Sequence, residues 1–243
     1  MIKLKPQQQT SSSSDSGFTI IESLLAIIVV AILLAAISPV LVMSTSIRVQ
    51  SRRIEKANQA ANTFIDGVRT GSIKAPGEYS NNNKISLDPA TASQPRNLDE
   101  NLINLTKMPV PATKDDSDLY LFQKDGIICH TSETGCAKNS DSPFDEFYIQ
   151  ARQIIVTGSG VNDGYRLVIR VYRSDVDFNK PLLTSTGNST KQTASAVTAG
   201  VGNRQAPAIE KTADVGNITT TFQALCRRLG VAPDKDGNNQ NCQ

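Results

Sequence analysis

The most prominent feature of the hydrophobic pattern is one long apolar run near the N-terminus. The run extends from Phe18 to Met43 and contains a single charged residue, Glu22. At a helical rise of about 1.5 Å per residue, the part after Glu22 is long enough to cross a hydrocarbon layer of roughly 30 Å. Residues 1–17 are polar and have nothing with which to form a core. The pattern therefore predicts a membrane-spanning helix behind a short polar leader.

An amphipathic segment follows the apolar run. Its apolar residues recur at helical spacing, and they are Ile47, Ile54, Ala57, Ala61, Phe64 and Val68. This spacing is typical of a helix that packs one face on a core. The charged residues fall off this stripe, and they are Arg48, Arg52, Arg53, Glu55, Lys56 and Asp66. Because Gly71 is a typical C-terminal stop, one helix is expected to run from Phe18 to about Thr70.

Four later segments have the length and composition of strands: Leu119 to Gln123, Ile127 to His130, Glu146 to Thr157, and Tyr165 to Arg173. In the last segment apolar residues alternate with arginines, which predicts a strand with one buried face. The alternating residues are Leu167, Ile169 and Val171 against Arg166 and Arg170. The loop from Gly158 to Gly164 is expected to join the last two strands as an antiparallel hairpin.

The remaining segments are expected to be less regular. Pro76 to about Asp118 is rich in Asn, Ser, Pro and Asp and predicts a long irregular connection. Thr184 to Gly202 consists almost entirely of small polar residues and predicts a flexible loop. A short helix is expected from Thr220 to Leu229.

The predicted fold class is α+β, with a long N-terminal helix whose C-terminal half packs on a small antiparallel sheet. The predicted parts are a leader (1–17), a membrane-spanning helix (18–43), its amphipathic continuation (44–71) and a β-rich globular domain with long loops (72–243).

The order of leader and apolar run separates this chain from an ordinary secretory protein. A secretory signal places an apolar stretch of about 7 to 15 residues before a small-residue cleavage site. Here the small residue, Gly17, precedes the apolar stretch, so cleavage after it removes only the leader. The arrangement resembles the class III signal peptides of type IV prepilins and pseudopilins, in which glycine is followed by phenylalanine and, at the fifth mature position, by glutamate. Gly17, Phe18 and Glu22 match this pattern.

This resemblance implies cleavage between Gly17 and Phe18 by a prepilin peptidase, and methylation of the new amine of Phe18. It also implies that Glu22 attracts the amine of Phe18 on a neighbouring subunit and sets the register of helices that enter a filament. A carboxylate within an apolar run costs about 2.5 to 3.5 kcal/mol on insertion scales, so such a residue usually has a function. The alternative is that Glu22 reaches the lipid headgroups of its own leaflet.

Pro39 resembles the helix-kinking proline of the same family. A proline inside a helix removes one hydrogen bond, which predicts a bend or a locally melted stretch near Ile37 to Val40. The alternative is that Pro39 only marks the exit of the helix from the membrane. The sequence after the apolar run also resembles the hormogonium polysaccharide secretion pseudopilins of filamentous cyanobacteria.

Two features depart from the family pattern. Ser16 stands where the family usually has lysine or arginine, which predicts slow processing. Two lysines precede the span (Lys3 and Lys5) and four basic residues follow it (Arg48, Arg52, Arg53 and Lys56), an order that by itself predicts a cytoplasmic C-terminal part. The prepilin pattern and the cysteines favour the opposite orientation.

The four cysteines form two sequence-local pairs, Cys129 with Cys136 and Cys226 with Cys242. An even, local arrangement favours disulfides in an oxidising compartment, although four cysteines allow three connectivities. We expect the two local pairs.

Composition and motifs exclude several classes of function. Lysine plus arginine number 25 against 23 aspartate plus glutamate, which shows no polyanion-binding bias, and aromatic residues make up 5%, which leaves few stacking platforms. The single histidine, His130, has no Gly-x-Ser-x-Gly motif beside it, and the chain has no phosphate-binding P-loop. We expect no enzyme activity, no nucleic-acid binding, and no cofactor or metal.

A calcium site near the C-terminus is the one metal-binding alternative. Asp234, Asp236, Asn238 and Asn239 surround Gly237 and supply oxygen ligands. Their spacing misses the EF-hand pattern, so we favour an aspartate-glycine turn, although some pseudopilins bind calcium near their C-termini.

The resemblance implies a structural subunit, a minor pilin or pseudopilin of a type IV pilus-like or type II secretion-like filament that supports polysaccharide secretion and motility. The expected location is the bacterial inner membrane, with one span and a periplasmic C-terminal domain, before assembly into a periplasmic or surface filament. The expected partners are other pilin subunits and the prepilin peptidase, with an assembly ATPase and a platform protein acting indirectly. The alternatives are a signal-anchored periplasmic domain that does not polymerise and a minor pilin for DNA uptake, which predicts a basic patch.

Overall fold

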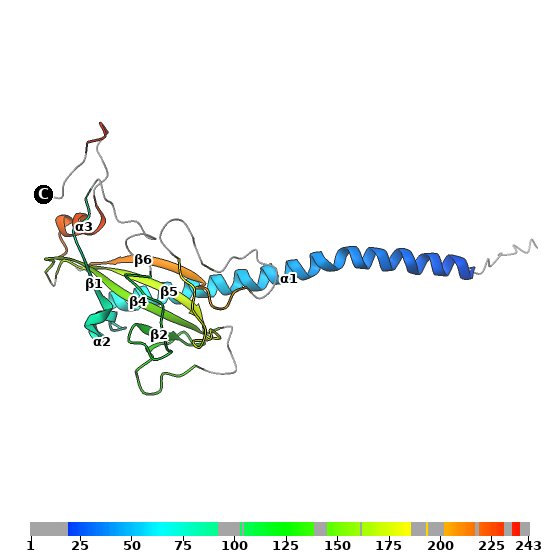
Figure 1. The fold of residues 1–243 in the computed structure, drawn as a ribbon, viewed down its shortest axis with the longest axis horizontal. Coiled ribbons are helices and arrows are strands. Elements are labelled where there is room, and N and C mark those ends of the chain that lie inside the picture. Colours follow the sequence, from blue (N-terminus) through cyan, green and yellow to red (C-terminus); the bar gives the residue numbers. More distant parts are fainter. Residues whose placement is uncertain are drawn as a thin grey trace, which may run out of the picture. The chain divides into compact units, whose positions relative to one another are not determined.

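The computed structural model describes residues 19–91, 103, 105–138, 145–160, 162–185, 193, 202–216, 219–230 and 235–238. The chain divides into two compact units, Met1–Thr45 and Ser46–Gln243. Helix α1 (Ile20–Thr70) contributes to both, and a six-stranded sheet lies in the second. The predicted α+β class is confirmed (Figure 1).

The elements after α1 are short. The helices are α2 (Pro76–Tyr79), the 3-10 turn η1 (Asn81–Asn83) and α3 (Phe222–Leu229). The strands are β1 (Lys84–Leu87), β2 (Leu119–Phe122), β3 (Ile128–His130), β4 (Phe147–Val156), β5 (Tyr165–Arg173) and β6 (Ile209–Val215). The strands β2 to β5 and helix α3 occur close to their predicted positions.

Local chemistry defines both ends of α1. The hydroxyl of Thr19 accepts a hydrogen bond from the backbone N–H of Glu22 at 3.2 Å, which satisfies one of the free N–H groups of the first turn. At the other end Gly71 has a φ of +74°, a left-handed conformation that glycine adopts without strain. The predicted stop after Thr70 is therefore confirmed, whereas the predicted start, Phe18, lies outside the described residues.

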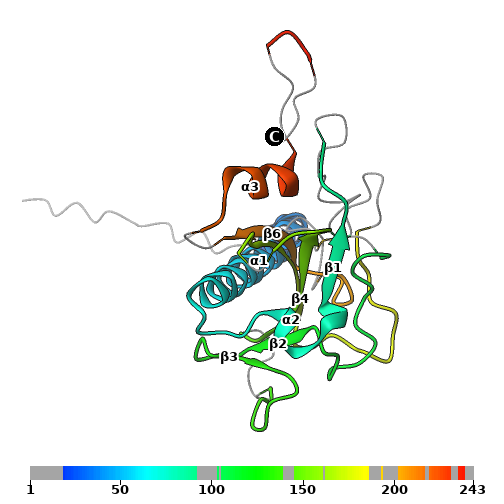
Figure 2. The ribbon, with the colours of Figure 1, turned by 90° about the vertical axis from the view of Figure 1, so that its left-hand side faces the viewer.

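The C-terminal half of α1 packs on one face of the sheet through small residues. Ala57, Ala60 and Ala61 are completely buried, and so is Phe64, whose ring lies 4.6 Å from that of Tyr120 in β2. Alanines at these positions let the helix approach the sheet closely, since they add little bulk between the two layers. Figure 2 shows α1 beside β6 and β4, with β1 on the other side of β4.

The buried face of α1 departs from the predicted stripe before Ala57. Gln50 and Arg53 are buried, whereas the predicted members Ile47 and Ile54 are only partly buried. A seven-residue repeat drifts by about 20° per heptad on a helix of 3.6 residues per turn, so the stripe rotates away from the sheet over three heptads. The expectation that Arg53 lies off the buried face is wrong.

Strand β4 is the centre of the sheet, whose strand order is β3-β2-β4-β5-β6. One edge of β4 pairs with β5, which confirms the predicted antiparallel hairpin. The other edge pairs first with β2 and then, over Gln153 to Val156, with β1. The β1–β4 pairing is parallel, so the sheet is not purely antiparallel as predicted.

Four elements lie where none was predicted, and one of them is the 3-10 turn η1, within the segment from Pro76 to Asp118. Both α2 and β1 also fall within this segment, which was expected to be irregular. Strand β6 has a polar sequence and is defined by its pairing with β5 rather than by its own pattern. Most of the predicted flexible loop from Thr184 to Gly202 lies outside the described residues.

Strand β5 is buried on both faces, which corrects the prediction of one buried face. Val168, Arg170 and Tyr172 are completely buried, as are the residues that alternate with them. The second face of the sheet is covered by residues from the connecting segments, including Ile103, Met108, Val110, Val176, Phe178 and Leu182. Tertiary contacts from these segments exclude water from the face that the arginine pattern assigned to solvent.

A row of polar side chains crosses this second face, because Gln150, Arg170 and Glu210 are paired residues on β4, β5 and β6. Arg170 Nε donates to Glu210 Oε1 at 3.2 Å, and Arg170 Nη1 donates to Gln150 Oε1 at 3.2 Å and to the carbonyl of Met108. Glu210 Oε1 also accepts from the backbone N–H of Ser185 at 3.2 Å. Burial lowers the pKa of Arg170, and Glu210 offsets part of this shift. The row thus binds two connecting segments to the sheet, the one that contains Met108 and the one that contains Ser185.

We predict that Arg170→Met lowers the free energy of unfolding by about 3–5 kcal/mol, because it leaves the buried carboxylate of Glu210 without its cation. Unfolding by urea of the full chain in detergent micelles, followed by tyrosine fluorescence because the chain has no tryptophan, measures the change. Arg204→Met is the control, since Arg204 is exposed and its loss is expected to cost less than about 0.5 kcal/mol. Equal unfolding midpoints for the two variants would contradict the prediction.

Candidate functional site

The first turn of α1 contains the residue that the sequence singled out, Glu22. Thr19 caps the helix by accepting from the N–H of Glu22, which is one half of the capping box that the Thr-x-x-Glu spacing is typical of. A negative charge in the first turn also interacts favourably with the helix dipole. Sequence reasoning missed this local role, although the Thr-x-x-Glu spacing signals it. The cleavage residues Gly17 and Phe18 lie outside the described residues, so their roles stay predictions.

The apolar part of α1 exposes its side chains in the structure. Every large apolar side chain from Ile20 to Met43 is about half exposed or more. Among the described residues, α1 is the one helix long and apolar enough to cross a membrane, a criterion of length and composition that core helices and signal sequences also meet. The coarse prediction of a single possible membrane span agrees with this finding.

Pro39 lies inside α1 and does not interrupt it. The chain is helical on both sides of Pro39, including Ile37 to Val40, so the locally melted stretch is not observed. The fixed φ of proline is compatible with a helix, and the cost lies in one lost backbone hydrogen bond. The suggested role of Pro39 in assembly stays a prediction.

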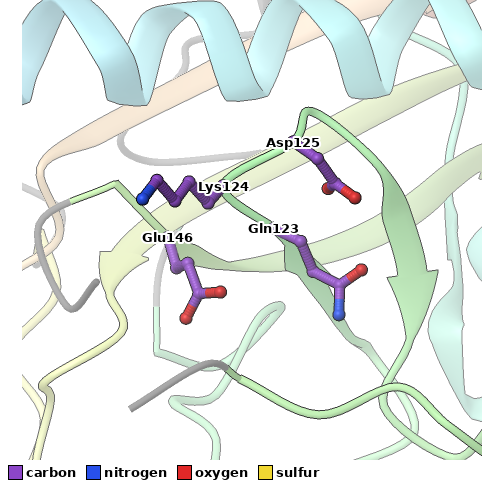
Figure 3. A pocket seen from close by; sticks show the side chains of 4 residues that line it. All are labelled: Gln123, Lys124, Asp125 and Glu146. Carbon is purple, nitrogen blue, oxygen red and sulfur yellow. The ribbon is translucent and has the colours of Figure 1, made fainter. Parts of the chain in front are cut away.

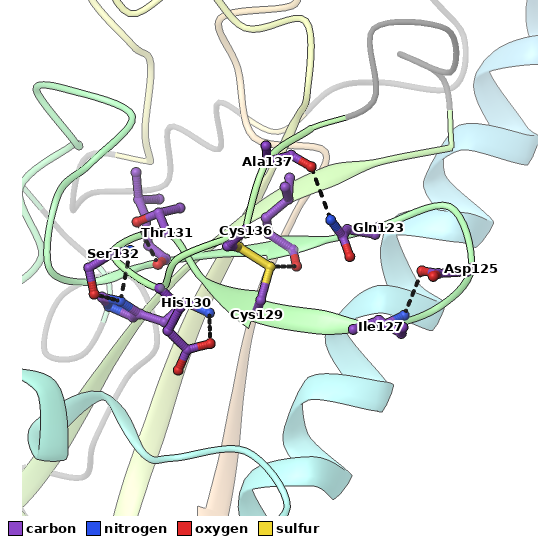
Figure 4. The surroundings of a disulfide bond; sticks show 12 residues. Gln123, Asp125, Ile127, Cys129, His130, Thr131, Ser132, Cys136 and Ala137 are labelled. Atoms are coloured by element: carbon purple, nitrogen blue, oxygen red, sulfur yellow. Dashed lines mark hydrogen bonds between the residues drawn. A yellow bond between two sulfur atoms is a disulfide. The ribbon is translucent and has the colours of Figure 1, made fainter.

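The disulfide predicted between Cys129 and Cys136 is present, with Cα atoms 5.7 Å apart (Figure 4). It closes a loop that begins in β3 and includes His130 and Glu133. The Sγ of Cys129 also lies 3.9 Å from the carbonyl of Leu121 in the neighbouring strand. Cys226 is buried in α3, and Cys242 lies outside the described residues, so their pairing stays a prediction.

His130 is an internal contact of this loop rather than an open site. Its Nε2 lies 3.0 Å from the carbonyl of Ser117, so Nε2 carries the proton and Nδ1 accepts from the N–H of Ser132 at 3.2 Å. His130 is 2% exposed, and its ring stacks on that of Tyr79 in α2, with centroids 3.7 Å apart. Ser132 is exposed and its Oγ lies 2.6 Å from Nδ1, whereas the histidine beside it is covered.

Tyr79 links α2 to the disulfide loop. Its hydroxyl donates to Glu133 Oε1 at 2.5 Å. This hydrogen bond is the main reason that the pKa of Glu133 lies below its ordinary value, and burial together with the same bond raises the pKa of Tyr79. The pair therefore joins two segments that are distant in the sequence, and its strength depends on the ionised form of Glu133.

A shallow pocket of about 430 Å³ lies beside the turn between β2 and β3 (Figure 3). Gln123, Lys124 and Asp125 come from the turn, and Glu146 precedes β4. The lining carries charges of both signs, and Gln123 is already bonded to the carbonyl of Ala137 at 3.0 Å. This mixture favours no particular class of ligand.

No group of three or more His, Cys, Asp or Glu side chains within the described part of the chain is arranged to hold a metal ion. Of the suggested calcium turn, the structure describes residues 235–238, and Gly237 there has a φ of +79°, as in a tight turn. Asp234 and Asn239 lie outside the described residues.

A groove of about 280 Å³ follows one face of α1, and we call it the basic groove. It is lined by Val49, Arg52, Arg53, Lys56 and Asp145. Lys56 Nζ forms an ion pair with Asp145, which precedes β4. Arg53 is 7% exposed, and burial together with the nearby Arg173 lowers its pKa. Arg52 is exposed, so it is the groove's accessible guanidinium.

The chain matches no protein-family model, and no curated protein or solved structure matches it significantly.

We predict that Tyr79→Phe raises the pKa of Glu133 toward its ordinary value, because the variant lacks the hydroxyl that stabilises the carboxylate. A lowered pKa in the folded state contributes stability above the ordinary carboxyl pKa of about 4.5, and this stability is lost as the pH falls through the folded value. The variant is expected to lack that contribution. An NMR titration of the Glu133 carboxyl measures the change, and Tyr165→Phe is the control that should leave it unaltered.

Proposed function

We propose that this chain is a structural subunit of a type IV pilin-like filament, stored in a membrane by the N-terminal part of α1. The observation that carries the proposal is an exposed apolar helix with one carboxylate in its first turn, in a chain whose sequence places Gly17 and Phe18 directly before that helix. The α+β arrangement, in which the same helix continues into the core of the globular unit, is compatible with a pilin-like architecture.

The proposed orientation places the globular unit outside the cytoplasm. The disulfide between Cys129 and Cys136 supports this orientation, since disulfides persist in oxidising compartments. The count of basic residues on the two sides of the span favours the opposite orientation. Of the four basic residues after the apolar run, Arg53 is buried and Lys56 is paired with Asp145 within the folded unit, which leaves Arg48 and Arg52 exposed.

The proposed partners are other pilin-like subunits and a prepilin peptidase, and an assembly ATPase with its platform protein would supply the energy. In this proposal Glu22 attracts the amine of Phe18 on a neighbouring subunit. Moving the helix from lipid into a filament then relieves an unpaired charge, which gives assembly a driving force and a register. The finer proposal, from the resemblance of the sequence, is a minor pseudopilin that supports polysaccharide secretion and motility.

The second candidate is a membrane-anchored extracytoplasmic domain that does not polymerise. The capping geometry of Thr19 and Glu22 favours it to a degree, because a glutamate that only starts a helix needs no partner subunit. The two proposals differ in whether the charge of Glu22 matters once the cap is preserved.

For processing, we predict that the mature chain begins at Phe18 and carries a methylated amine. Mass spectrometry of the N-terminal peptide tests this directly. Gly17→Leu places a bulky side chain at the scissile bond and is expected to leave uncleaved precursor in the membrane. Normal cleavage of this variant, or a mature chain that begins elsewhere, would refute the proposed processing.

For assembly, we predict that Glu22→Gln abolishes filament-dependent export while the subunit still accumulates, is cleaved and stays folded. Glutamine can replace glutamate in a capping box, so this variant removes the charge and keeps the cap. Thr19→Val is the matched control, since it removes the cap and keeps the charge, and it is expected to retain export. Immunoblots of membranes and of sheared filaments provide the measurement.

The opposite pattern, in which Thr19→Val stops export and Glu22→Gln does not, would assign Glu22 to helix capping. Wild-type export and filament incorporation in both variants would favour the non-polymerising anchor.

A further inference from the structure

The basic groove combines cations with an apolar contact on one face of α1. Val49, Arg52, Arg53 and Lys56 are spaced by three, one and three residues, which places them on one side of a helix. Three cations face one carboxylate, that of Asp145, so the groove has a positive excess. Such a surface is complementary to an anion, and a guanidinium binds phosphate oxygens through two parallel hydrogen bonds.

Two exposed arginines lie on this side of the helix, one turn apart. Arg48 and Arg52 are both exposed, and neither forms a hydrogen bond or an ion pair with another described residue. Arg53 and Lys56 are already engaged within the folded unit, as described above. The accessible charge of the surface is therefore that of Arg48 and Arg52.

The place of these arginines along α1 suggests what they bind, provided that the proposed membrane anchoring is correct. A hydrocarbon core of about 30 Å corresponds to roughly 20 helical residues, so a span that starts at Glu22 ends near Val42. Arg48 and Arg52 then follow the core by about 9 and 15 Å. The headgroup layer is about 5 to 7 Å deep on each side of the core.

Side-chain direction brings the charges closer to the lipid. Each Cα–Cβ bond of a helix tilts toward the N-terminus, which here is the direction of the apolar run. Arginine side chains extend in this way with the aliphatic stem along the helix and the guanidinium among polar headgroups. Arg48 thus reaches the headgroup layer, and Arg52 lies within about one Debye length of it.

We propose that Arg52 of the basic groove and Arg48, one helical turn before it, bind the phosphodiester headgroups of anionic phospholipids in the leaflet that the globular unit faces. While the subunit is stored, these two contacts tie the part of α1 just beyond the span to the lipid headgroups. Extraction of the subunit into a filament must break them, so they oppose premature release. Binding weakens as salt increases, because the guanidinium groups are exposed.

The test uses the full-length protein in a neutral detergent, with phosphatidylglycerol or phosphatidylcholine added to the micelles. Native mass spectrometry measures the lipid retained by the protein. We expect the wild-type protein to retain phosphatidylglycerol preferentially. Each arginine is expected to contribute about fivefold in affinity, or roughly 1 kcal/mol, so Arg48→Gln with Arg52→Gln should lower the affinity about 25-fold.

The matched control is Arg204→Gln with Lys235→Gln, which removes the same charge from two exposed residues outside the groove. This control is expected to keep the preference for phosphatidylglycerol, and all variants should unfold at the wild-type temperature. Equal retention of the two lipids by the wild-type protein, or equal losses in the two double variants, would overturn the inference. The lipid assay requires no filament. A negative result in it therefore leaves the export prediction for Glu22 untouched. Likewise, normal export by the Glu22 variant would leave lipid binding untouched.

Discussion

Close packing of α1 against the sheet is the constraint on which the rest of the globular unit depends. Ala57, Ala60 and Ala61 present almost no side-chain bulk, so the helix approaches the sheet closely enough for Phe64 to contact Tyr120. A fully buried phenylalanine contributes about 1.5–3 kcal/mol relative to exposure, and larger residues at the alanine positions would separate the two layers. Since this helix also carries the apolar run, the element that organises the core is the one proposed to enter a membrane and a filament.

The opposite face of the sheet combines a buried polar row with apolar contacts. Arg170 lies between Gln150 and Glu210, and these three side chains hold the carbonyl of Met108 and the backbone of Ser185. Two apolar clusters form on this face of the sheet. A buried guanidinium is stable only where acceptors surround it, so the connecting segments and the strand residues must be arranged together.

The basic segment of α1 from Arg48 to Lys56 contributes to folding and, in our proposal, to membrane contact. Arg53 is buried, Lys56 pairs with Asp145, and Arg48 and Arg52 are exposed. A count of charges along the chain treats these four residues alike. Their different roles follow from helical phase, because neighbouring positions on a helix lie about 100° apart.

Glu22 also has two roles. Its backbone N–H is bonded to the capping hydroxyl of Thr19, which gives Glu22 a local role beside the proposed intermolecular one.

The sequence by itself determined the long helix, its end at Gly71, and the strands β2 to β5 with their hairpin. Each of these depends on spacing within one segment or on residues near each other in the chain. Only the tertiary structure decided the burial of Arg170, the parallel pairing of β1 with β4, the existence of β6 and the burial of Arg53. These depend on segments far apart in the chain: a polar strand such as β6 forms because β5 offers it hydrogen bonds, and an arginine is buried where distant loops supply its acceptors.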